Sequence, residues 1–342
     1  MQGQAAPEYS GGVPTPPAPA EPSARSPSAP AARLTSSPLL VGVGLVVGVL
    51  AVSTSAILIR VADAPPVSIA FWRCAGGSVA LAPFALRARR RSGPLDGVQR
   101  RQLVASGLFL AAHFAAFISS LSYTTVASAA VLVATVPLFV GAGAAVFLAE
   151  PASKKTWAGI ALAMVGAAGI ALADVTGLPT GDALLGDVLA FAGAALVAGY
   201  LIIGRAARQR LPVSRYAADV YGFAAVALLI AALASGSSLT GYSTATWLAI
   251  AGMIVGPQLL GHTVFNTLLG AVPPTVIAVV VIAEPIGSTI LAYFLLSETP
   301  AAGFWLAAPL IVAGVWLSVL GARVGEQGAV RVEPADVASP QP

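Results

Sequence analysis

The chain has 342 residues, of which 57% are hydrophobic and 9% are charged, and its mean hydropathy is +0.86. A soluble domain carries roughly 25% charged residues because its surface faces water, so this composition excludes a soluble globular protein. The net charge of +4 is better explained by orientation in a membrane than by an acidic partner, and nucleic acid is not expected as a partner. The one cysteine, Cys74, excludes an internal disulfide, and no Cys/His cluster predicts a metal or cofactor site.

The chain begins and ends with segments that lack a periodic apolar pattern. Residues 1–37 are rich in Pro, Ala, Ser and Gly, a composition that predicts disorder. We expect a cytoplasmic tail here and a second cytoplasmic tail over residues 322–342. Between the tails, residues 38–175 and 184–321 form two halves that consist almost entirely of apolar segments.

Ten apolar segments are long enough to cross a hydrocarbon core of about 30 Å, which takes about 20 residues each. They run approximately over 39–59, 66–86, 102–121, 126–148, 156–173, 184–204, 217–235, 244–265, 272–296 and 303–321. The segments must be helices, because lipid offers no water to an unpaired backbone and the alternating pattern of a barrel is absent. The expected fold class is an all-α integral membrane protein with ten transmembrane helices.

The two halves repeat each other in sequence. Residues 39–60 align without a gap on residues 184–205, and the matches include Arg60 with Arg205. Further matches are Pro137 with Pro285, Glu150 with Glu298, Trp157 with Trp305, and Gly166 with Gly314. Because each half holds five spans, an odd number, the second half must enter the membrane from the opposite side. We therefore expect two inverted five-helix repeats around a shared site.

The basic residues predict the orientation of the chain. With a cytoplasmic amino terminus, every Lys and Arg except Arg60 and Arg73 falls on the inner side. The positive-inside rule then places both termini in the cytoplasm. The expected location is the cell (plasma) membrane, with the lipid bilayer as the surrounding partner.

Several of these residues carry a resemblance to a known family. They are Phe71-Trp72-Arg73, the pattern Pro137…Leu148-Ala149-Glu150…Trp157…Gly166, and its echo Glu284-Pro285…Leu296-Ser297-Glu298…Trp305…Gly314. Over residues 38–321 the chain resembles the drug/metabolite transporter superfamily, specifically the EamA-type permeases. The resemblance implies ten spans in two inverted halves. It also implies export or uptake of small metabolites, amino acids among them, without ATP hydrolysis.

Glu284 is the foremost candidate for a functional residue. It lies near the middle of the expected ninth span, where a charged carboxylate costs at least about 2.5–3.5 kcal/mol. We interpret it as a proton-binding or amine-binding group, the alternative being a protonated side chain bonded to a neighbouring helix. Pro285 removes a backbone hydrogen bond and predicts a bend, and Pro137 predicts the same in the fourth span.

Five further polar residues lie within the expected spans. Arg73 either snorkels to the interface or faces a cavity, where it would bind a substrate carboxylate or pair with Glu284. The only histidines, His113 and His262, are either a titrating pair in the pathway or neutral residues that bond between helices. Tyr200 and Asn266 are pathway candidates, although such polar tips more often make interhelical bonds.

The sequence therefore favours a secondary transporter that moves a small polar metabolite by alternating access around a midplane cavity, with protons as a candidate coupling ion. An intramembrane enzyme is the alternative, but the chain holds no HExxH, GxSxG or Asp-x-Asp pattern. A multi-span sensor without cargo is a third interpretation. Glu150 and Glu298, at the ends of spans, are expected to cap the following helix and hold the loop. Substrate, direction of transport and oligomeric state remain open at this stage.

Overall fold

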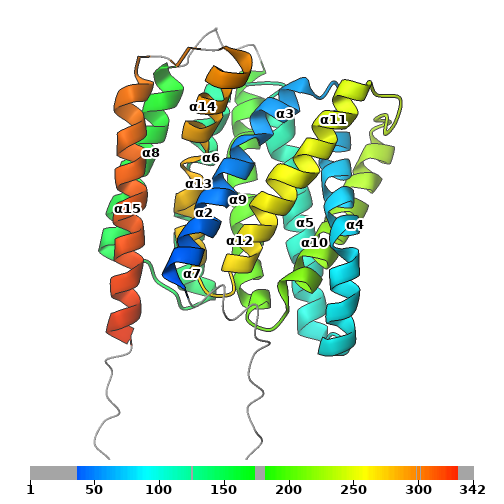
Figure 1. The fold of residues 1–342 in the computed structure, drawn as a ribbon, viewed down its shortest axis with the longest axis horizontal. Helices are drawn as coiled ribbons and strands as arrows, with labels where there is room; N and C mark the ends of the chain where they lie inside the picture. The colour runs from blue at the N-terminus through cyan, green and yellow to red at the C-terminus, as the bar shows by residue number, and fades with distance from the viewer. Residues whose placement is uncertain (1–36, 125, 174–181, 298, 301, 330–342) are drawn as a thin grey trace, which may run out of the picture.

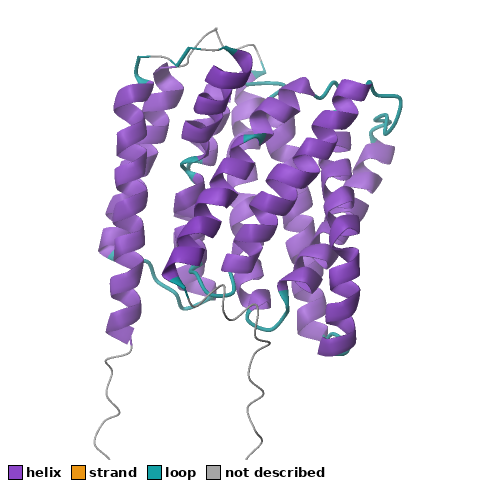
Figure 2. Ribbon diagram, in the orientation of Figure 1, coloured by secondary structure: helices purple, strands orange, loops and turns teal. Residues whose placement is uncertain are grey.

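The computed structural model describes residues 37–124, 126–173, 182–297, 299–300 and 302–329. Every regular element within these ranges is a helix, and no strand occurs among them (Figure 2). The expected all-α class is therefore confirmed. The expected tails and Glu298 lie outside the described residues, except that the last helix continues past residue 321 to Ala329.

The helices of the first half lie before residue 174. They are α2 (Pro38–Ser53), α3 (Ser55–Val61), α4 (Pro66–Ser92), α5 (Gly97–Ser120), α6 (Val126–Val133), α7 (Val136–Phe147) and α8 (Lys154–Ala173). The second half contains α9 (Ala183–Arg208), α10 (Val213–Ala234), α11 (Thr244–Met253), the π-helical segment η1 (Ile254–His262), α12 (Thr263–Leu268), α13 (Pro274–Val281), α14 (Glu284–Leu296) and α15 (Phe304–Ala329).

These helices have the length and composition of membrane spans. Within the described residues, eight helical stretches are long and apolar enough to cross a bilayer, and the apolar stretch Val131–Phe147 is shorter. Large apolar side chains cover the outside of the bundle; Phe147 is 77% exposed and Leu306 is 79% exposed. A protein in water does not expose apolar surface of this extent. The chain is therefore a multi-pass membrane protein.

Two of the interruptions follow directly from proline. Pro137 and Pro285 are the second residues of α7 and α14, and in each case the preceding helix ends a few residues earlier. A proline has no N–H to donate to the carbonyl four residues before it. The expected bends at these two prolines thus take the form of full breaks, α6/α7 and α13/α14.

The other two interruptions have different origins. The first span is broken at Thr54, whose hydroxyl donates to the carbonyl of Ala51 at 2.7 Å. The eighth span widens into the π-helical η1, which contains Pro257. Single-turn π-helical segments are frequent at functional sites. The sequence predicted both spans as continuous helices.

The helices pack in pairs that join the two halves. α8 packs along α15 at one side of the bundle, α4 along α10 at the other, and α5 along α9 between them (Figure 1). α2 packs against η1, α12 and α14. Close approach of α8 and α15 depends on glycines, because a Cβ at Gly159 would lie 2.5 Å from the carbonyl oxygen of Gly314.

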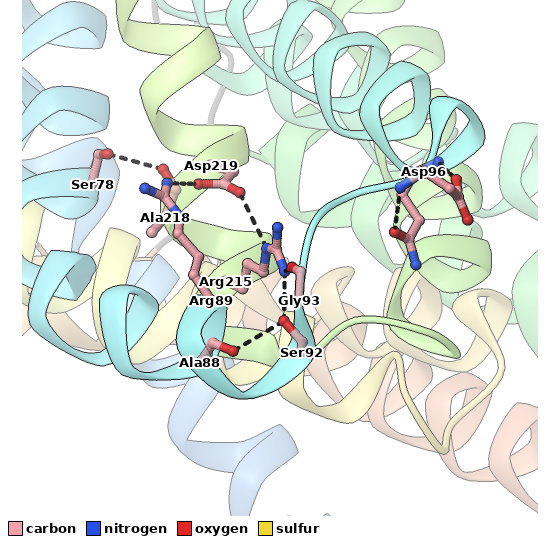
Figure 3. Close-up of polar contacts among 10 residues, drawn as sticks. Ser78, Ala88, Arg89, Ser92, Gly93, Asp96, Arg215, Ala218 and Asp219 are labelled. Atoms are coloured by element: carbon pink, nitrogen blue, oxygen red, sulfur yellow. Dashed lines mark hydrogen bonds and ion pairs between the residues drawn. The ribbon is translucent and has the colours of Figure 1, made fainter.

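The α4–α10 pair is fastened at both ends and in the middle. At one end Arg89 pairs with Asp219, and Arg215 donates to Ser92 and to the carbonyl of Gly93 (Figure 3). The middle contact runs from the Ser78 hydroxyl to the carbonyl of Ala218. At the other end Ser68 and Trp72 donate to the carbonyls of Ser238 and Leu239, in the loop that follows α10, at 2.7 and 2.8 Å.

Candidate functional site

A cavity of about 80 Å³ lies inside the bundle. Both halves of the chain line it, and the walls come from the interrupted helices together with α4, α5 and α9. Most of the lining is apolar. The polar side chains that reach it are Ser55, Arg73, His113, Tyr200, His262 and Glu284. A cavity of this size holds a few waters, so it must widen to admit a metabolite.

Arg73 points into the bundle from α4. Its side chain is 3% exposed, and Nε donates to Oε1 of Gln258 at 2.9 Å. Nη1 donates to the Ser55 hydroxyl at 3.2 Å, and the guanidinium carbon lies 4.2 Å from the centroid of the Phe114 ring. These contacts hold the cation at the cavity wall and compensate part of its desolvation.

The two histidines line the same cavity, and both of their rings contact the ring of Phe114. The ring centroids of His113 and His262 lie 5.2 and 5.3 Å from that of Phe114. Nδ1 of His113 lies 2.8 Å from the carbonyl oxygen of Gly193, so Nδ1 carries the proton, and Nε2 is an acceptor when the ring is neutral. The His262 ring makes no hydrogen bond to any residue that the structure describes.

Tyr200 belongs to a buried chain of hydrogen bonds. Its hydroxyl donates to Oδ1 of Asn266 at 2.6 Å, and Nδ2 of Asn266 donates to the Tyr221 hydroxyl at 3.2 Å. The Tyr221 hydroxyl lies 3.0 Å from that of Thr263. Tyr200 thus lines the cavity and bonds between helices, whereas Asn266 is fully buried beside it and does not line it.

Glu284 is the first residue of α14 and lines the cavity. Its carboxylate forms no hydrogen bond or ion pair within the described part of the chain. The backbone around it is held firmly: the Ser53 hydroxyl donates to the Glu284 carbonyl at 3.1 Å, and the Ser288 hydroxyl donates to the Ser53 carbonyl at 3.0 Å. The break between α13 and α14 is therefore docked on the break between α2 and α3.

The proline breaks also leave acceptors at the cavity. Pro137 and Pro285 cannot donate to the carbonyls of Val133 and Val281, and both valines line the cavity. No described residue donates a hydrogen bond to either carbonyl. The breaks therefore leave two backbone acceptors in residues that line the cavity, to which Glu284 brings a carboxyl group and Arg73 a cation from another helix.

The structure thus brings Glu284, Arg73, His113, His262 and Tyr200 to one cavity, with the two prolines at its walls. Sequence reasoning missed three contributors. Phe114 and Ser55 carry no signal in the sequence that separates them from other residues of apolar spans. Tyr221 could have been found, since a tyrosine hydroxyl in the middle of a span needs an interhelical partner.

Glu150 does not cap the next helix as expected. Ser153 does so, because its hydroxyl accepts from the backbone N–H of Thr156 at 3.1 Å. Glu150 instead pairs with Arg205, with Oε1 and Nε 2.9 Å apart. Trp72, beside the cavity arginine, packs edge-on against Trp247 at 5.3 Å.

The chain consists of long apolar helices from two sequence repeats, and these helices enclose a cavity with a few polar groups. This architecture is typical of membrane transporters. The model of the EamA-like transporter family matches residues 39–172 and again residues 184–320. The chain therefore belongs to the EamA-like transporter family.

A crystal structure of another protein is similar to this chain with a TM-score of 0.70. The two are 20% identical, and the match covers 85% of this chain and 100% of the other. At this identity the likeness establishes the fold alone. A search of curated protein sequences finds no match.

Proposed function

We propose that this chain is a secondary transporter of small metabolites such as amino acids, and that it works by alternating access around the central cavity. In this proposal ten spans form two inverted five-helix repeats in the plasma membrane, with both termini in the cytoplasm. The observation that carries it is the cavity itself, which both family repeats line and to which Glu284 brings a carboxyl group and Arg73 a guanidinium.

The packing pattern supports the inverted repeat. Under the repeat, α5 against α9 corresponds to η1 and α12 against α2, and α7 against α9 corresponds to α14 against α2; each of these contacts occurs. α8–α15 and α4–α10 are each paired with their own counterpart. In Figure 1, α2 begins at the end of the bundle where α15 finishes, which supports placing both termini on one side.

The chemistry of the cavity suits a zwitterion. Glu284 and the carbonyls of Val133 and Val281 are acceptors that match a substrate ammonium group, and Arg73 matches a carboxylate. Apolar walls would accommodate the side chain. Glu284 without a fixed partner is also the group best placed to take up a proton, which gives a route to proton coupling.

The test is uptake into proteoliposomes, with cargo chosen by metabolite profiling of cells that contain or lack the protein. We expect Glu284→Gln and Arg73→Gln to lower uptake at least tenfold, while the matched variant Arg90→Gln, at the exposed end of α4, transports normally. Normal uptake by both cavity variants would refute the site. Reporter tags after residue 178 and at the carboxyl end should appear on opposite sides; tags on the same side would refute the inverted topology.

A further inference from the structure

An ion pair joins the two halves of the chain beyond one end of the cavity. Nε of Arg205 lies 2.9 Å from Oε1 of Glu150, and Nη1 of Arg205 donates to the carbonyl of Leu269 at 2.9 Å. Glu150 follows α7, Arg205 lies near the end of α9, and Leu269 follows α12. One guanidinium therefore holds three helices of the bundle together.

The position of this contact makes it a floor for the cavity. On α9 the cavity-lining Leu201 precedes Arg205 by one helical turn, and Phe265 precedes Leu269 by the same interval. One turn of helix is about 5.4 Å. A second arginine completes this layer, because Arg208 donates to the carbonyl of Asn266 at 2.8 Å and to that of Leu211.

The Glu150 carboxylate depends on Arg205. The side chains of Arg205 and Glu150 are only 14% and 24% exposed, and Oε2 of Glu150 is buried without a hydrogen-bond partner in the described ranges. The backbone fixes the carboxylate in place: Ala149 is left-handed at φ 55°, and the Glu150 N–H donates to the carbonyl of Ala144 at 3.1 Å. Loss of the arginine would leave a half-buried charge uncompensated.

A second pocket, of about 260 Å³, is lined by Ala56 and Ile118 among others. These two residues directly follow Ser55 and Phe117, which line the central cavity. This pocket is separate from the central cavity and lies toward the end where α3 and α5 finish, opposite to Arg205.

We propose that the Glu150–Arg205 pair is the latch that closes the cavity at the end where α2 begins, and that it must separate for the cavity to open there. This inference rests on the alternating access of the proposed function. Glu150 and Arg205 act as positioning residues: they do not line the cavity, but their bond holds α7 against α9 and α12. Breaking the bond shifts the population of states toward the one open at this end.

The test measures access to the cavity without any cargo. The full chain carries Cys74→Ala and Leu201→Cys, which leaves a single thiol on the cavity floor, and is reconstituted into vesicles of each orientation. A charged, membrane-impermeant thiol reagent is then added from one side at a time. We expect Glu150→Gln and Arg205→Gln to label at least about fivefold faster than the parent from the side where α2 begins.

Two variants complete the design. The charge swap Glu150→Arg with Arg205→Glu should bring labelling back toward the parent rate, since it re-forms the pair. Arg210→Gln, an exposed arginine just beyond α9, should label as the parent does. Arg205→Lys keeps the charge but loses the bond to Leu269, so its labelling rate should fall between the rates of the parent and of Arg205→Gln. It replaces Arg205→Gln in the test if that variant is not monodisperse in size-exclusion chromatography.

The latch would be overturned if folded Glu150→Gln and Arg205→Gln were labelled at the parental rate. It would also be overturned if the charge-swapped variant were labelled as fast as the two single variants. These outcomes are independent of cargo. If amino acid uptake fails but labelling changes as expected, the latch stands and the cargo is wrong. If uptake succeeds and labelling is unchanged, only the latch falls.

Discussion

A single added methyl group between α8 and α15 should destabilise the fold measurably. A Cβ at Gly314 would lie 2.4 Å from the backbone nitrogen of Ala163 and 2.6 Å from the carbonyl oxygen of Gly159. Ordinary van der Waals contacts are 3.4–4 Å, and neither contacted atom can rotate away because both are backbone. Gly314→Ala must therefore push the two helices apart by about 1 Å.

That displacement has a second cost. The Ser318 hydroxyl donates to the Thr156 carbonyl at 3.1 Å, and the Thr156 hydroxyl donates to the Ser318 carbonyl at 3.3 Å. An added 1 Å or so takes both beyond hydrogen-bonding range. Overpacking costs about 1–3 kcal/mol, and each interhelical bond in a membrane about 0.6 kcal/mol. The free energy of unfolding should fall by about 2–4 kcal/mol.

The assay is unfolding of the purified protein in mixed micelles, followed by circular dichroism. Gly42→Ala is the matched control, since a Cβ there meets nothing within 4 Å, and it should stay within about 0.5 kcal/mol of the parent. Equal stability of the two variants would show that α8 and α15 do not approach each other as closely as the structure has them.

Three further predictions concern the cavity. Glu284→Gln should flatten the dependence of uptake on pH, measured in proteoliposomes from pH 5 to 8; an unchanged profile would remove this carboxyl as the coupling group. Phe114→Ala should lower the free energy of unfolding by about 3–5 kcal/mol and raise uptake of larger analogues relative to smaller ones, and an unchanged cargo preference would contradict its place in the wall. Tyr221→Phe removes the acceptor for Nδ2 of Asn266 and should cost about 1–3 kcal/mol in the same unfolding assay, with an exposed control at Tyr293→Phe expected to be neutral.

The sequence was sufficient to predict the class of fold. Long apolar segments with few charges can only be membrane helices, and the repeat of Pro137 at Pro285 located both proline breaks. These features depend on local composition and spacing, which a single sequence contains in full.

The remaining features depend on which helices touch. Arg73 donates a hydrogen bond to Gln258, which is 185 positions away in the chain. No local pattern in the sequence predicts that partner. The break at Thr54 was not visible because threonine is tolerated inside a span; the neighbouring Ser53 is bonded to Glu284, far along the chain. The role of Glu150 was misread for the same reason, since its partner Arg205 belongs to the other half.

The fastening of α4 to α10 has a practical consequence. Salt links at one end, hydroxyl and indole contacts at the other, and Ser78 between them leave this pair little freedom to shear. The conformational change of the transport cycle would then take place in the interrupted helices around the α4–α10 pair. Arg73, on α4, would stay in place while those helices move. Spin labels on α4 and α10 should keep a constant separation in every state, so this pair can serve as the internal ruler for distance measurements across the transport cycle.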